Sequence, residues 1–152
     1  MKWISIPKIE EGTVNEDAVN VLGNLVALSD GAGGGGVFAD LWSKYLVGQI
    51  TAEPISDFRS FDQWISDIWE AFYNECETKA KHEGGMLLNK FYDEGSCATF
   101  VAVWKISDSC CQWIAYGDSV AFHYNFHTKK LEYSYCSLAD FDKPPYLINC
   151  KD

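Results

Sequence analysis

Residues 15–31 have the sequence NEDAVNVLGNLVALSDG. Two short apolar runs flank Gly23-Asn24, a pair that accepts the positive φ angles of a two-residue turn. The stretch predicts a β-hairpin whose second strand ends at Asp30 and Gly31. When such a hairpin closes, the acidic pair Glu16-Asp17 becomes a neighbour of Asp30.

Three carboxylates held together repel one another unless a hard cation such as Mg²⁺ or Mn²⁺ binds to their oxygens. Gly31 has no Cβ, so its backbone carbonyl is accessible to such an ion. An alternative interpretation is that Asp17 and Asp30 are turn and cap residues, because Asp is common in turns. The hairpin sequence leaves both interpretations open.

Two helices are predicted after the hairpin. Apolar residues recur at helical spacing over about residues 35–50. A capping box at Ser60 and Gln63 and an apolar stripe predict a second helix that ends at Gly84-Gly85. The aromatic residues of that stripe are expected to pack in a core.

The second half of the chain has the pattern of short strands. Four apolar runs are separated by turn residues and cover residues 97–104, 112–116, 120–126 and 131–136. Their spacing leaves no room for crossover helices, so they predict an antiparallel meander. Strands, helices and strands in this order indicate an α+β fold in one domain, residues 1–152.

Composition narrows the function classes. The chain is 47% hydrophobic and 15% aromatic, which argues against disorder. Its formal net charge of −10 argues against binding to nucleic acid or to an anionic membrane and favours a cation. No apolar stretch approaches the roughly 18 residues of a membrane span, and the apolar run before Pro7 is too short for a signal peptide. We therefore expect a cytoplasmic protein in which the six cysteines are reduced.

The glycine run over residues 31–36 formally fits the dinucleotide fingerprint GxGxxG between a strand and a helix. Asp30 stands directly before it, where its charge would oppose a pyrophosphate. This charge makes the match to the fingerprint weak. A nucleotide-binding α/β domain is kept as a third hypothesis, beside the two that are stated at the end of this section.

Four motifs together resemble the metal-dependent Ser/Thr protein phosphatases of the protein phosphatase 2C (PPM) family. In chain order they are NEDA (residues 15–18), SDGAGG (29–34), GSCAT (95–99) and YGDS (116–119). The resemblance covers essentially the whole chain. It implies an antiparallel β-sandwich flanked by helices in α-β-β-α layers, with Mg²⁺ or Mn²⁺ as cofactor and two ions in the complete site.

The resemblance also implies roles for single residues. Asp30 is similar to the carboxylate that bridges two metal ions, Gly31 to a carbonyl ligand and Glu16 to a ligand of the second ion. Asp17 is similar to the residue that holds a metal-bound water, and Asp118 to an aspartate near the binuclear centre. Asp30 and Asp17 are the expected catalytic residues; Glu16, Asp30, Gly31 and Asp118 are the expected metal ligands.

The chain departs from the family pattern in three places. Gly12 stands where many members have a phosphate-binding Arg, and Ala32 and Gly35 stand where a His is common. The chain stops at Asp152, before the later segments that supply two more metal carboxylates. By this comparison the domain is incomplete at its C-terminus.

The resulting hypothesis is a phosphoserine/phosphothreonine phosphatase domain that hydrolyses its substrate with a metal-activated water, and this chain is expected to be an N-terminal part of it. The alternative is a catalytically inactive, phosphatase-like binding or regulatory module. The expected partners are a phosphoprotein substrate or a regulatory protein, and self-association through open sheet edges is a further expectation.

Overall fold

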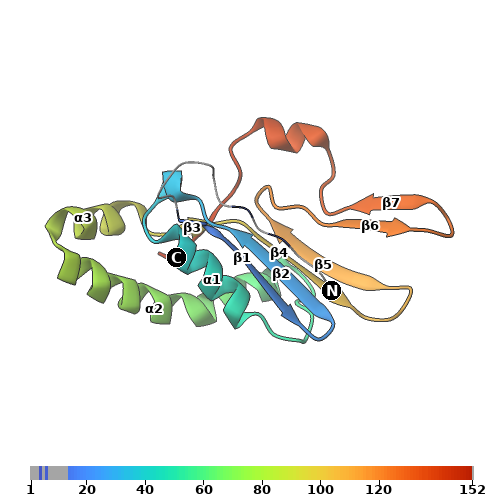
Figure 1. The fold of residues 1–152 in the computed structure, drawn as a ribbon, viewed down its shortest axis with the longest axis horizontal. Coiled ribbons are helices and arrows are strands. Elements are labelled where there is room, and N and C mark those ends of the chain that lie inside the picture. Colours follow the sequence, from blue (N-terminus) through green and yellow to red (C-terminus); the bar gives the residue numbers. More distant parts are fainter. Residues whose placement is uncertain (1–3, 5, 7–13, 152) are drawn as a thin grey trace.

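The computed structural model describes residues 4, 6 and 14–151 of the chain. Figure 1 shows the arrangement of its elements. The first half contains β1 (Asp17–Leu22), β2 (Leu25–Asp30), η1 (Gly33–Gly35), α1 (Ala39–Gln49), α2 (Phe58–Glu83) and α3 (Gly85–Glu94). The second half contains β3 (Cys97–Ala98), β4 (Phe100–Lys105), β5 (Cys111–Tyr116), β6 (Phe122–Asn125), β7 (Lys130–Tyr133), η2 (Leu138–Asp142) and β8 (Ile148–Asn149).

The central element is a four-stranded antiparallel sheet with strand order β1-β2-β4-β5. The predicted hairpin forms its first two strands, and Gly23 adopts a φ of 58° in the turn. The α+β class is therefore confirmed. The second sheet layer of a β-sandwich remains a prediction.

One face of this sheet is the core face. Leu25, Ala27 and Ser29 alternate as buried residues along β2, and Phe100, Ala102 and Trp104 lie on the same face of β4. Helix α1 packs on β1 and β2, where the side-chain amide of Asn20 donates a hydrogen bond to the Val47 carbonyl at 2.7 Å. The first turns of α2 place Phe61 and Trp64 against Phe100, with ring centroids 5.8 and 5.2 Å away.

The helices differ in detail from the predicted ones. Helix α1 begins at Ala39 because the glycine run before it forms the short helix η1. Helix α2 begins earlier than predicted, since its N-cap is Asp57, whose carboxylate accepts a hydrogen bond from the Ser60 N–H at 2.8 Å. That hydrogen bond also lowers the pKa of Asp57. Helix α2 ends before Gly84 as expected, but α3 follows at once and was not predicted.

The strand region is also less regular than predicted. The run 97–104 is divided at Thr99 into β3 and β4, and β3 pairs with the unpredicted strand β8. The pairs β4–β5 and β6–β7 are antiparallel, as a meander requires. In the described residues, however, β6 and β7 form a two-stranded sheet of their own.

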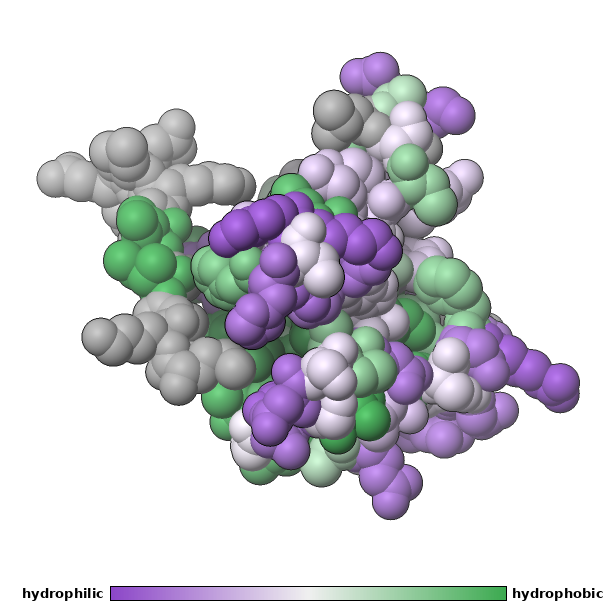
Figure 2. All heavy atoms as spheres, turned by 90° about the vertical axis from the view of Figure 1, so that its right-hand side faces the viewer, coloured by the Kyte–Doolittle hydropathy of each residue, from purple (hydrophilic) through white to green (hydrophobic). Residues whose placement is uncertain are grey.

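The β6–β7 hairpin projects from one end of the molecule and exposes aromatic side chains. Phe122 is 63% exposed and lies opposite Tyr133, and Phe126 at the turn is 75% exposed. Figure 2 views the molecule from this end, where hydrophilic side chains protrude with hydrophobic ones between them. Among the described helices, none combines the length and apolar composition needed to cross a bilayer.

Trp42 connects α1, α2 and the C-terminal strand in the core. It is fully buried, its ring centroid lies 4.6 Å from that of Phe72, and its Nε1 donates a hydrogen bond to the Ile148 carbonyl at 2.9 Å. Trp42→Phe is expected to lower the free energy of unfolding by about 2–3 kcal/mol, because it leaves a void and a buried carbonyl without its donor. Urea denaturation followed by circular dichroism measures this loss.

Trp113→Phe is the matched control, since Trp113 is half-buried on the opposite face of the sheet. Its expected cost is below about 1 kcal/mol. Equal losses in the two variants would contradict the role given to Trp42.

Candidate functional site

Backbone hydrogen bonds join three of the four sequence motifs at one end of the sheet. The Gly31 N–H donates to the Glu16 carbonyl at 3.1 Å, which closes the hairpin beyond its last strand pair. The Thr99 N–H donates to the Asp30 carbonyl at 2.9 Å, and the Ala32 N–H donates to the Cys97 carbonyl at 2.8 Å. Segments about 65–70 positions apart along the sequence therefore meet at the ends of β1 and β2.

Thr99 brings in the fourth motif. Its side chain is only 3% exposed, and its Oγ1 lies 2.5 Å from Ser119 Oγ in the YGDS turn. The buried Ser29 hydroxyl donates to the Thr99 carbonyl at 2.6 Å. Gly117 adopts a φ of 90°, and a Cβ at that position would lie 2.7 Å from Thr99 Cγ2. The turn can thus approach Thr99 closely only with a glycine at its start.

Asp17 and Asp30 are directly opposite one another across β1 and β2. Because cross-strand partners project to the same face of a sheet, the two side chains share the face opposite the core. Like charges placed directly opposite are destabilising, and a divalent cation relieves that repulsion. The structure therefore places side by side the two residues for which the family resemblance implies a catalytic role.

The Glu16 carboxylate packs against the glycine run, unlike the side chains of Asp17 and Asp30, which are cross-strand partners. A Cβ on Gly33 would lie 2.0 Å from Glu16 Oε1, so this carboxylate rests against the glycine run. The Ser43 hydroxyl of α1 donates to the Glu16 carbonyl at 2.5 Å and fixes the backbone there. Gly33 leaves the space that the Glu16 side chain occupies.

The site is not a closed metal cage. Within residues 14–151 and the other described positions, no group of three or more His, Cys, Asp or Glu side chains is arranged to hold a metal ion. Asp30 and Asp118 are both exposed to solvent. Asp118 joins the other motifs through the hydrogen bond of its neighbour Ser119, not through its own carboxylate.

The structure bears on one of the three sequence departures, the one at Ala32, and on the nucleotide hypothesis. Gly12 and Asp152 lie outside the described residues. At Ala32 the backbone is bonded to Cys97, and no imidazole is available there. The strand before the glycine run pairs antiparallel with both its neighbours, β1 and β4. A dinucleotide fingerprint requires a parallel βαβ unit, so the third hypothesis loses its structural basis.

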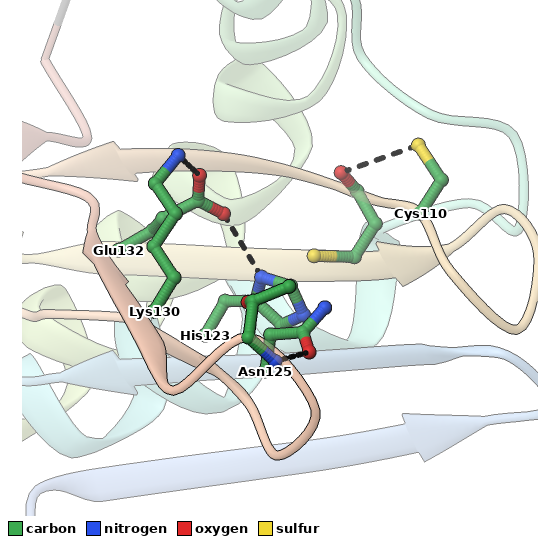
Figure 3. Close-up of polar contacts among 7 residues, drawn as sticks. Cys110, His123, Asn125, Lys130 and Glu132 are labelled. Atoms are coloured by element: carbon green, nitrogen blue, oxygen red, sulfur yellow. Dashed lines mark hydrogen bonds and ion pairs between the residues drawn. The ribbon is translucent and has the colours of Figure 1, made fainter.

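Sequence reasoning missed a second polar cluster, on the β6–β7 hairpin (Figure 3). His123 Nδ1 lies 3.0 Å from Glu132 Oε2, and Lys130 Nζ lies 2.7 Å from Glu132 Oε1. Both contacts lower the pKa of Glu132. Burial raises the pKa of the nearby Cys111 thiol, with smaller contributions from Cys110 and Glu132. A protonated thiol is a poor nucleophile, so we assign this cluster to hairpin stability.

Comparison with known proteins identifies no relative: no protein-family model matches the chain, and no curated protein or solved structure is significantly similar to it. The functional argument therefore depends on the motifs and on the geometry described above.

Two glycines of the run provide a test of the close packing at the site. A Cβ on Gly31 would lie 2.6 Å from the Ala39 carbonyl oxygen and 2.9 Å from that of Glu16, both backbone atoms. Gly31→Ala is expected to lower the free energy of unfolding by about 1–3 kcal/mol, because rigid backbone must move. Denaturant titration measures this loss.

Gly34→Ala is the matched control, since nothing lies within 4 Å of a Cβ at that position. Its expected effect is within about 0.5 kcal/mol. If Gly31→Ala were as stable as Gly34→Ala, the close approach of β1, the glycine run and α1 would be refuted.

Proposed function

We propose that this chain is a metal-dependent phosphoserine/phosphothreonine protein phosphatase domain of the protein phosphatase 2C type. The observation that supports the proposal most strongly is the junction of four separate motifs at one end of the sheet, through Glu16–Gly31, Asp30–Thr99 and Thr99–Ser119. Each motif by itself is a weak indication of the family. Four unrelated turns would not be expected to meet at one place in the fold. The proposal includes the family's two-layered sheet.

The chain's own residues divide the work of such a site. Asp30 and Asp17 offer adjacent carboxylates at the ends of β2 and β1, and the buried Gly31 follows Asp30 directly in the chain. Mg²⁺ and Mn²⁺ prefer such oxygen ligands and retain several waters, so two carboxylates are sufficient for a weak site. A divalent ion bound here would lower the pKa of a water and neutralise phosphoryl charge.

Asp118 and Glu16 would complete the ligand set from two other directions. Asp118 lies in the turn that Ser119 anchors to Thr99, and the Glu16 carboxylate rests against Gly33. Both are carboxylates on short segments held by hydrogen bonds: Ser43 donates to the Glu16 carbonyl, and the Ser119 hydroxyl beside Asp118 contacts the Thr99 hydroxyl. Fixed segments reduce the entropy that a ligand set loses when an ion binds.

A second candidate function is a phosphatase-like binding module without turnover. It is favoured by the lack of a formed metal cage among the described side chains and by the sequence departures at Gly12 and Ala32. Such a module would retain the fold and a weak divalent site. Its partner would be a regulatory protein or a phosphoprotein.

Hydrolysis of p-nitrophenyl phosphate and of a phosphothreonine peptide with Mn²⁺ tests the phosphatase proposal. We expect turnover that EDTA abolishes and that Asp30→Asn lowers at least about a hundredfold, because the amide cannot supply the charge that holds the ion. Divalent binding, measured by calorimetry, should weaken in the same variant.

Asp62→Asn is the control, since Asp62 is an exposed carboxylate on α2 and the substitution removes the same charge. It should leave both turnover and Mn²⁺ binding unchanged. Mn²⁺ binding that depends on Asp30 without any turnover would support the binding module instead. Equal effects of the two substitutions would refute the metal site.

A further inference from the structure

A pocket of about 450 Å³ lies between the Gly117-Asp118-Ser119 turn and residues 134–146. Asp118 and Ser119 form one side, and Ser134, Tyr135 and Lys143 contribute to the other. In Figure 1 this second side belongs to the segment that connects β7 to β8 and includes η2. No motif identified in the sequence includes residues of that side.

The two sides are held together by specific contacts. The Ser134 N–H donates to the Ala121 carbonyl at 3.0 Å, and the Ala121 N–H donates to Ser134 Oγ at 2.9 Å. The Tyr135 and Phe141 rings meet edge to face at 5.0 Å between centroids, which anchors the part of the segment just before Lys143. The pocket is therefore formed before any ligand arrives.

The pocket adjoins the acidic end of the sheet. Ser119 on its wall is hydrogen bonded to Thr99, and the Thr99 N–H is bonded to the Asp30 carbonyl. A group that enters beside Asp118 is thus close to the carboxylates that we assign to the metal.

Lys143 lines this pocket together with one carboxylate, Asp118, with which it forms no ion pair. Among the described residues it has no ion-pair or hydrogen-bond partner. By contrast, five other lysines pair with carboxylates: Lys44, Lys81, Lys90, Lys105 and Lys130. In a chain with a formal net charge of −10, an unpaired lysine beside two serine hydroxyls favours an anionic ligand with several acceptor oxygens.

We propose that this pocket binds the phosphorylated side chain of the substrate and that Lys143 forms an ion pair with its phosphoryl oxygens, an inference that rests on the proposed function. A phosphate monoester carries about −1.5 to −2 charges near neutral pH, and a lysine ammonium is an effective point-charge partner for it. Ser119 and Ser134 offer hydroxyl donors on the two sides of the same pocket. The exposed Tyr146 ring extends the wall toward solvent, where the flanking peptide would lie.

Calorimetric binding of a phosphothreonine peptide and of its unphosphorylated counterpart, each with and without Mn²⁺, tests this inference. The native chain should prefer the phosphorylated peptide. Lys143→Ala should weaken its binding by about tenfold to a hundredfold, the loss expected for one charged hydrogen bond, without changing affinity for the unphosphorylated peptide. Lys143→Arg should retain affinity within about threefold, because the charge is kept.

Lys90→Ala is the matched control, since Lys90 is an exposed lysine on α3 that does not line the pocket. It should bind as the native chain does. No preference for the phosphorylated peptide, or equal binding by Lys143→Ala and Lys90→Ala, would overturn the inference. If phosphopeptide binding depended on Lys143 but the chain showed no metal-dependent turnover, the pocket assignment would be supported and the proposed hydrolysis would be refuted.

Discussion

The antiparallel register of β1 and β2 is the constraint on which the rest of the site depends. It places Asp17 directly opposite Asp30, and the next hydrogen bond, from Gly31 to Glu16, fixes where the glycine run leaves the sheet. A slip of one residue in this pairing would put Asp17 and Asp30 on opposite faces of the sheet, because side chains alternate along a strand. The buried positions Leu25, Ala27 and Ser29 prevent that slip, since each fits only the face that the helices cover.

A small group of buried and half-buried hydroxyls connects the turns at this end of the hairpin. Ser29, Thr99 and Ser119 are linked through hydrogen bonds to one another or to each other's backbone, and Ser43 adds a link to α1. Buried polar groups are costly without partners, and here every hydroxyl has one. Such a network specifies a single arrangement of the turns, whereas apolar residues of the same size would permit several.

Charge is distributed unevenly around this junction. The carboxylates of Asp17, Asp30 and Asp118 belong to the sheet end, while the ammonium of Lys143 lies across the adjoining pocket. A cation bound by the carboxylates would neutralise the negative charge of the sheet end, and an anion bound by Lys143 would neutralise its ammonium. A phosphate ester bound to a metal ion supplies both the cation and the anion. The rigid core formed by Trp42, Phe61 and Phe100 keeps these parts in place without contributing to the chemistry.

The sequence by itself determined the hairpin and the α+β class, because the Gly23-Asn24 turn and the alternation along β2 are local signals. It also indicated that Asp17 and Asp30 would be neighbours, since a hairpin leaves no other arrangement. It did not predict α3, the Asp57 cap, the break at Thr99 or strand β8. Strand β8 pairs with β3 about 50 residues away, and the pocket at Lys143 depends on contacts between turns that no local pattern specifies. Only the tertiary structure decided these features, because long-range pairing and side-chain packing override local propensity.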